Sequence, residues 1–331
     1  MNETASLNGG NCNIAKNMDR EYWSSNAQET AGLNISKLGL GTVEIGLPYG
    51  IGDNKLPSDK EAERILRTAV EMGITYIDTA RGYGVAEERI GKFGISSMKG
   101  IVIGTKCAQF LERGGDPRGE DLDRKIRQEI EVSLRNLKVD SLQLVQLHGG
   151  SREQIERGEL VEIMRKLKAE GKVQHIGIAT RGEEAPLAAI DSSCFTVIQT
   201  AYSILDQRVA KKVLPGAQKN DIAIINRSVL LKGALTPAVQ KLPPKLNQLK
   251  ENAAAAAAMA ESLGIDLPTL AFRFVISNAA VTCALLGTIN PAHLRTAQKA
   301  IEAGPLPEDV LEKLEDLAIE DPNQIDPARW P

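Results

Sequence analysis

The sequence predicts an α/β protein, a single-domain (β/α)8 TIM barrel with an extension at each end. From Leu33 onward, short β-branched runs alternate with longer amphipathic stretches, and eight such runs occur before the chain ends. This alternation favours a parallel sheet with helices between its strands. Eight right-handed crossovers bring such a sheet back to its first strand. The length of 331 residues accommodates a barrel of roughly 250 residues.

The expected strands cover 36–42, 75–78, 101–106, 142–148, 173–179, 196–200, 222–227 and 281–286. The expected helices cover 59–72, 121–137, 155–170, 206–218 and 246–263, the last continuing to 277. The alanine run 253–258 lies inside that last helix, because alanine is the best helix former. The barrel domain is therefore expected over 33–320.

The two ends carry fewer structural signals. Residues 1–32 are rich in Asn, Ser and Thr, and their few apolar side chains cannot offset the entropy of ordering them alone. We expect them to form a tail that is mobile or caps the barrel. Residues 321–331 form a C-terminal tail, expected to be an unconstrained terminus, with Trp330 folding back over the barrel mouth as the alternative.

Composition and charge exclude several classes of partner. The net charge of -3 and the pI near 5.8 provide no basic field for nucleic acid or an anionic membrane. The chain shows no signal-peptide pattern and no apolar run of about 18 residues. Cys12, Cys107, Cys194 and Cys283 lack metal-ligand spacing. We expect a cytoplasmic protein with reduced thiols, no metal and a small-molecule partner.

Four polar residues stand at the ends of predicted strands. Asp78 ends an apolar run, Tyr83 follows it between glycines, and Lys106 and His148 end two later strands. Barrels keep their chemistry at the carboxyl ends of the strands. Each residue alone has a structural explanation: a packing tyrosine, a capping aspartate, a core histidine, or a lysine at the solvent rim. Their occurrence at successive strand ends favours a functional site.

These side chains suggest a proton donor. A phenol has a pKa near 10, and we expect the Lys106 ammonium to lower the pKa of Tyr83 while Asp78 keeps Lys106 charged. No activated serine, activated cysteine or metal site is apparent in the sequence, so the other reactant must be supplied. Hydride from a nicotinamide cofactor meets that need.

Three motifs in chain order carry a family resemblance: Asp78-Thr-Ala-x-x-Tyr83-Gly-x-x-Glu87, Gly104-Thr-Lys106 and Gln146-Leu-His148-Gly149. From about Leu38 to about Ala303 the chain resembles the aldo-keto reductase superfamily. The resemblance implies NADPH-dependent reduction of an aldehyde or ketone, with a sugar-like or small polar carbonyl as the candidate substrate. It implies that Tyr83 gives the proton, that Lys106, paired with Asp78, lowers the pKa of Tyr83, and that His148 orients the carbonyl.

The resemblance also implies a set of cofactor-binding residues. They are Thr42, Asp78, Thr180, Gln199, Arg227, Ser228, Val229, Leu230, Gly233, Gly287, Thr288, His293 and Arg295. Thr180 and Gln199 would meet the nicotinamide carboxamide, and the segment from Arg227 to Gly233 would lie along the pyrophosphate and under the ring. From the residues alone, Asn290 and Pro291 predict a helix start after the last strand, which is either a phosphate site or an ordinary capped helix.

Some positions depart from the family pattern. Thr296 and Ala297 replace a Glu-Asn pair at the adenine, and His293 replaces a commonly basic residue. Arg295 is either a contact to the 2′-phosphate or a surface charge. We favour NADPH over NADH.

Two other classes of function remain open. One is a non-catalytic or slow nicotinamide-cofactor-binding subunit of the same fold. The other is a lyase or aldolase with Lys106 as a Schiff-base nucleophile, although Asp78 as its counter-ion argues against a neutral amine.

Overall fold

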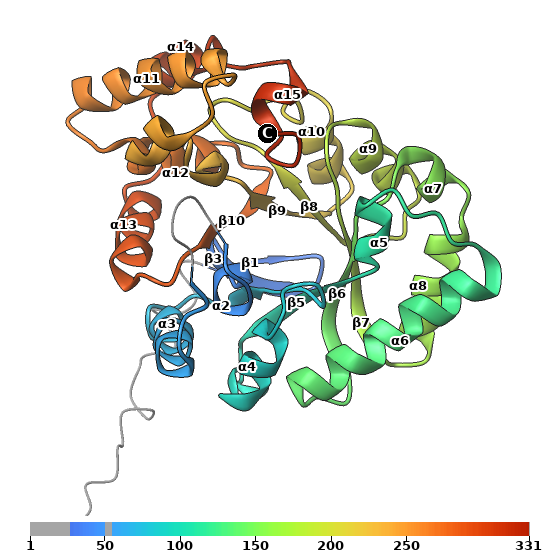
Figure 1. Ribbon diagram of the computed structural model, residues 1–331. Helices are drawn as coiled ribbons and strands as arrows, with labels where there is room; N and C mark the ends of the chain where they lie inside the picture. The colour runs from blue at the N-terminus through green and yellow to red at the C-terminus, as the bar shows by residue number, and fades with distance from the viewer. Residues whose placement is uncertain (1–26, 50–54, 331) are drawn as a thin grey trace, which may run out of the picture.

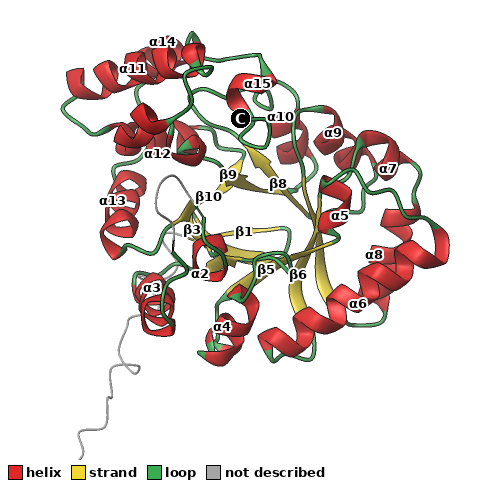
Figure 2. Cartoon of the chain, in the orientation of Figure 1, coloured by secondary structure: helices red, strands yellow, loops and turns green. Residues whose placement is uncertain are grey.

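The computed structural model describes residues 27–49 and 55–330. Eight parallel strands close into a barrel in the order β10-β3-β4-β5-β6-β7-β8-β9, with helices around the outside (Figures 1 and 2). The strands are β3 (Leu38–Gly41), β4 (Tyr76–Asp78), β5 (Val102–Cys107), β6 (Leu142–His148), β7 (Val173–Ala179), β8 (Val197–Ala201), β9 (Ala223–Arg227) and β10 (Val281–Gly287). Each overlaps its expected range, and the predicted fold class is confirmed.

The helices include several that the sequence did not separate. They are α2 (Val43–Gly46), α3 (Asp59–Glu71), α4 (Ala86–Lys92), α5 (Gln109–Glu112), α6 (Gly119–Leu137), α7 (Arg152–Glu156), α8 (Glu159–Ala169), α9 (Glu184–Asp191), α10 (Val213–Lys219), α11 (Asn247–Ser262), α12 (Leu267–Ser277), α13 (Pro291–Glu302), α14 (Glu308–Glu315) and α15 (Pro322–Ile325). Short 3-10 turns cover Ile95–Ser97, Leu231–Gly233 and Pro237–Lys241.

Three expected helices are corrected by the structure. The stretch 155–170 is divided into α7 and α8 at Gly158, whose φ of 85° lies in the left-handed region. The stretch 246–277 is interrupted at Gly264, after which Asp266 caps α12 by accepting from the Thr269 amide. Of 206–218, only the part from Val213 is helical, since the preceding residues form turns.

A hairpin of β1 (Ala27–Thr30) and β2 (Leu33–Ser36) lies against the barrel (Figure 1). Leu33 and Ile35 are buried in one cluster with interior barrel side chains, among them Tyr76, Leu144 and Ile225. The apolar positions of β2 thus complete the packing of the barrel interior. Residues 27–30 fall in the segment expected to be a tail; residues 1–26, with Cys12, lie outside the described part.

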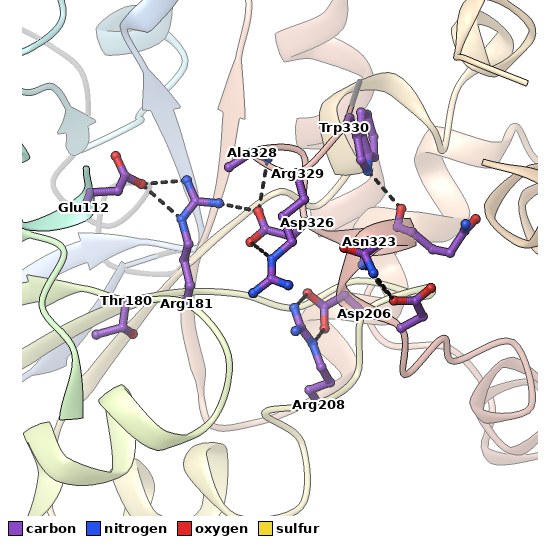
Figure 3. Close-up of polar contacts among 12 residues, drawn as sticks. Glu112, Thr180, Arg181, Asp206, Arg208, Asn323, Asp326, Ala328, Arg329 and Trp330 are labelled. Atoms are coloured by element: carbon purple, nitrogen blue, oxygen red, sulfur yellow. Dashed lines mark hydrogen bonds and ion pairs between the residues drawn. The ribbon is translucent and has the colours of Figure 1, made fainter. Parts of the chain in front are cut away.

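The expectation of an unconstrained C-terminus is wrong. Ile325 is buried, Trp330 donates a hydrogen bond of 3.0 Å from Nε1 to the Gln324 carbonyl, and Arg181 forms an ion pair with Asp326 (Figure 3). The segment is held because it buries apolar side chains and because Arg181, which follows β7, pairs with Asp326. None of the helices in the described ranges is long and apolar enough to cross a membrane.

Candidate active site

Lys106, near the end of β5, is the centre of a buried polar cluster. Its Nζ lies 2.6 Å from Asp78 Oδ2, 2.9 Å from the Thr79 carbonyl oxygen and 3.4 Å from Tyr83 Oη. Burial alone would lower the pKa of Lys106, but Asp78 and Tyr83 beside it favour the charged form and leave the pKa above its ordinary value. The expected pairing of Lys106 with Asp78 is present, and the ammonium is charged at neutral pH.

The Asp78 carboxylate is fixed from several strands. Its Oδ1 accepts a hydrogen bond of 2.7 Å from Gln199 Nε2 on β8, and Tyr76 Oη and Gln146 Nε2 lie 3.4 and 3.5 Å away. The backbone carbonyl of Asp78 accepts from the amide and the hydroxyl of Thr42, at 2.9 and 2.8 Å. These bonds leave the carboxylate one orientation, the one that holds Lys106.

Tyr83 sits on the loop between β4 and α4. The loop can approach α2 closely because Gly84 has a φ of 53° and a Cβ there would lie 2.2 Å from the Gly46 carbonyl oxygen. The pKa of Tyr83 lies above its ordinary value, because burial disfavours the phenolate more than Lys106 favours it. The expectation that Lys106 brings this pKa below the ordinary value is therefore wrong, although Lys106 acts in the expected direction.

His148 lies at the end of β6, with its ring edge-on to Tyr83 at a centroid distance of 5.8 Å. Burial, with Lys106 nearby, lowers the pKa of His148 to about 3, against an opposing effect of Glu112. The imidazole is therefore neutral at physiological pH and carries one N–H. Nδ1 has no hydrogen-bond partner among the described residues, and Nε2 lies 3.6 Å from Glu112 Oε2. This arrangement can offer a hydrogen bond without a positive charge.

A cavity of about 1200 Å³ opens beside Asp78, Tyr83 and His148. It exceeds the roughly 300–1000 Å³ typical of ligand pockets, so it has room for a dinucleotide together with a small substrate. Ten of the expected cofactor-binding residues besides Asp78 line it: Thr42, Thr180, Gln199, Arg227, Ser228, Val229, Leu230, Gly233, Gly287 and His293. The structure thus brings nearly the whole expected set to the lining of one cavity.

The helix start after β10 forms one end of this cavity. Asn290 caps α13 by accepting from the Ala292 amide at 3.0 Å, and Pro291 is the first helical residue. Thr288 is buried just behind the cavity wall and bonds to His293 Nδ1 at 3.0 Å. Arg295 is exposed on α13 and does not contribute to the cavity wall. A helix N-terminus at this place suits a phosphate group.

Arg227, at the end of β9, lines the cavity. Its guanidinium donates to the Thr180 carbonyl oxygen and to Ser228 Oγ, each at 3.1 Å. Ser228 has a φ of 64°, so the chain turns sharply directly after β9. After this turn, Val229, Leu230, Lys232 and Gly233 line the cavity.

Sequence reasoning missed many residues of the cavity wall, among them Glu112, Arg181 and Lys232. Glu112, at the end of α5, accepts from Arg181 Nε and Nη2 at 3.1 and 2.6 Å, and Arg181 also binds Asp326 (Figure 3). Lys232, in the turn after β9, lies over the Tyr49 ring at 5.9 Å. Arg181 directly follows Thr180 at a strand end, which is a usable signal, whereas Glu112 lies in a stretch with no regular pattern.

Comparisons with known proteins agree with this geometry. The profile of the aldo/keto reductase family matches residues 37–319. The chain is 28% identical to D-threo-aldose 1-dehydrogenase from a Pseudomonas species, over 81% of this chain and 90% of the relative. It is 27% identical to NADH-specific methylglyoxal reductase from Escherichia coli, over 80% of this chain and 90% of the relative.

A solved structure supports the same fold. The holo form of aldo-keto reductase AKR11C1 from Bacillus halodurans superimposes with a TM-score of 0.74 at 24% identity, covering 92% of this chain and 99% of the other. The family match spans most of the chain, and the barrel, the buried lysine and the cavity agree with it. The chain belongs to the aldo/keto reductase family and is an NAD(P)H-dependent oxidoreductase.

Proposed function

We propose that the protein reduces a small polar or sugar-like aldehyde or ketone to the alcohol with NADPH, and that Tyr83 is the proton donor. The observation that carries this proposal is the position of the Lys106 ammonium, 3.4 Å from Tyr83 Oη and 2.6 Å from Asp78 Oδ2. A phenol, a fixed cation and a neutral histidine thus meet at the edge of a cavity large enough for a dinucleotide.

The nicotinamide cofactor supplies the hydride when it is bound. The raised pKa of Tyr83 keeps its proton in place at neutral pH, so the acid form is fully populated. As the carbonyl oxygen gains negative charge it becomes a stronger base than a phenolate, and the proton passes to it from Tyr83 Oη. Lys106 then stabilises the phenolate that remains. The neutral His148 can donate a hydrogen bond to the substrate oxygen without transferring its own proton.

The cofactor and the substrate class are proposed from the start of α13 and from the relatives. The start of α13, with His293 and Thr288 bonded together, suits the phosphate on the adenosine, and we propose NADPH although one relative is named as NADH-specific. Two relatives are named for aldose or galactose oxidation, in keeping with a hydroxylated substrate. Cys107, Cys194 and Cys283 are free thiols, which supports a reducing compartment such as the cytoplasm.

The test is NADPH oxidation in the presence of a panel of aldehydes. Tyr83→Phe should lower kcat by about 10² to 10⁴-fold, the usual contribution of a general acid, while NADPH affinity measured by fluorescence stays the same. Tyr202→Phe is the matched control, since Tyr202 is a buried tyrosine that packs on Phe274 away from the cavity. A wild type no faster than Tyr83→Phe would favour the cofactor-binding subunit without catalysis.

The lyase or aldolase alternative is disfavoured by the same geometry. Schiff-base formation needs a neutral amine, and the Lys106 ammonium is held charged by Asp78. Borohydride trapping of an aldehyde on Lys106 would reverse this conclusion.

A further inference from the structure

Glu112 is held beside the catalytic histidine by contacts on both its backbone and its side chain. Gly149, directly after His148, has a φ of 111°, and a Cβ there would lie 2.7 Å from the Glu112 amide nitrogen. This close approach lets the end of α5 pack against the end of β6. The Glu112 side chain reaches from there into the cavity, with Oε2 3.6 Å from His148 Nε2.

The two oxygens of the Glu112 carboxylate have different surroundings. Oε1 accepts both hydrogen bonds from Arg181, at 3.1 and 2.6 Å. No hydrogen bond to Oε2 is present among the described residues, and His148 Nε2 lies 3.6 Å from it. Burial would raise the pKa of Glu112, but the hydrogen bond from Arg181 and the surrounding cations bring it below its ordinary value. Glu112 thus presents a charged, unused acceptor to the place where a carbonyl would bind.

The Arg181 guanidinium beside Glu112 is already paired with two carboxylates. Arg181 directs Nε and Nη2 to Glu112 and Nη1 to Asp326 (Figure 3). Arg227 directs Nη1 to Ser228 and Nη2 to the Thr180 carbonyl oxygen. The Arg181 charge is thus shared between two carboxylates, so a carboxylate on a substrate would face the negative charge of Glu112. A substrate ammonium would face the positive charges of Arg181 and Arg227, which line the same cavity.

We infer that Glu112 is a specificity-determining residue, which accepts a hydrogen bond from a hydroxyl next to the substrate carbonyl and rejects carbonyls that carry a carboxylate there. This inference rests on the proposed carbonyl reduction. It narrows the substrate to an uncharged hydroxy-aldehyde or hydroxy-ketone. A hydroxyl on the adjacent carbon lies close to the carbonyl oxygen, so a carbonyl bound at His148 Nε2 brings that hydroxyl within reach of Oε2.

The test uses three aldehydes of similar size: glycolaldehyde, propanal and glyoxylate. With wild-type protein and NADPH, kcat/KM for glycolaldehyde should be about tenfold higher than for propanal, since a hydrogen bond to a charged group has an effect of this order. The kcat/KM for glyoxylate should be at least about tenfold lower than for propanal, because its carboxylate is placed next to the like charge of Glu112. In Glu112→Gln, the glycolaldehyde-to-propanal ratio should fall and the glyoxylate-to-propanal ratio should rise, each by about tenfold.

Glu153→Gln is the matched control. Glu153 also lines the cavity, but its carboxylate binds Ser151 Oγ at 2.6 Å and is exposed, so both ratios should stay at the wild-type values. Equal use of the three aldehydes by the wild type, or unchanged ratios in Glu112→Gln, would overturn the inference and leave the reductase proposal intact. If Glu112→Gln does not fold, the wild-type ratios and Glu112→Asp, with its retracted carboxylate, decide the question. A wild type that reduces none of the three overturns both.

Discussion

Lys106 Nζ and Asp78 Oδ2 lie 2.6 Å apart, and the two side chains are only 1% and 5% exposed. In a pair so deeply buried, the cost of desolvating both charges offsets much of the favourable Coulomb energy. The role of the pair is to orient Lys106, because Asp78 holds the ammonium in the position that faces Tyr83.

Asp78→Asn should destabilise the fold as well as the active site. The substitution leaves a buried ammonium without its counter-ion, and removing one partner of a buried pair costs about 3–5 kcal/mol. Urea unfolding measures this loss. Asp78→Asn/Lys106→Met should recover part of it, because no isolated charge remains buried. Lys166→Met removes an exposed lysine paired with Glu162 and should leave the unfolding midpoint unchanged; additive losses in the double variant would contradict the coupling.

His148 should make stability depend on pH. Its pKa is about 3 in the folded protein against an ordinary value of 6.5. Between these two pH values, His148 is therefore protonated in the unfolded chain and neutral in the folded protein. Stability therefore falls as pH decreases, by about 2 kcal/mol from pH 7 to pH 5 for this group. The measurement is the free energy of unfolding at both pH values in the wild type and in His148→Asn. The variant should lose about 2 kcal/mol less over this interval; equal losses would mean that His148 is protonated in the folded state.

The strands and the residues at their carboxyl ends were predictable from sequence. β6 and β7 coincide with the ranges expected from their apolar runs, and Lys106 and His148 fall at strand ends, so a barrel necessarily brings them to one mouth. The helix breaks were not predictable from periodicity, because Gly158 and Gly264 interrupt patterns that continue on both sides.

Contacts between loops that are distant in the chain could not be predicted from the sequence. Arg181 and Asp326 are 145 residues apart, and no local pattern pairs them. The direction of the pKa of Tyr83 was predicted wrongly for a related reason: it depends on the balance between burial and the nearby Lys106 charge, and the degree of burial is set by the surrounding loops.

Ile35→Ala should weaken the barrel from the end opposite the active site. Ile35 is fully buried among interior barrel residues, and removing its three outer carbons should cost about 2–5 kcal/mol of unfolding free energy. Asn34→Ala is the control, since the Asn34 side chain is exposed on the same strand. Urea unfolding should separate the two variants while kcat stays near the wild-type value in both. A similar midpoint for both would mean that the hairpin adds little to the packing of the barrel.

Asp326→Asn should loosen the C-terminal segment over the cavity. Asp326 binds Arg181 across the barrel mouth and also accepts from the Ala328 amide (Figure 3). Arg181 is 37% exposed, so the ion pair is partly screened and its loss should cost about 1 kcal/mol or less. Amide hydrogen exchange of residues 322–330 should accelerate by up to about fivefold. Asp309→Asn, which removes an exposed partner of Lys313, should leave that exchange unchanged.

The same segment allows a second check of this ion pair without any substitution. Raising the salt concentration to about 1 M shortens the screening length to about 3 Å, so exchange of residues 322–330 in the wild type should approach that of Asp326→Asn. The variant itself should respond little to salt. If exchange in the wild type is insensitive to both the substitution and the salt, then the buried Ile325 and the hydrogen bonds of Gln324 with Leu249 and Lys245 hold the segment without the ion pair, and Arg181 serves only to position Glu112.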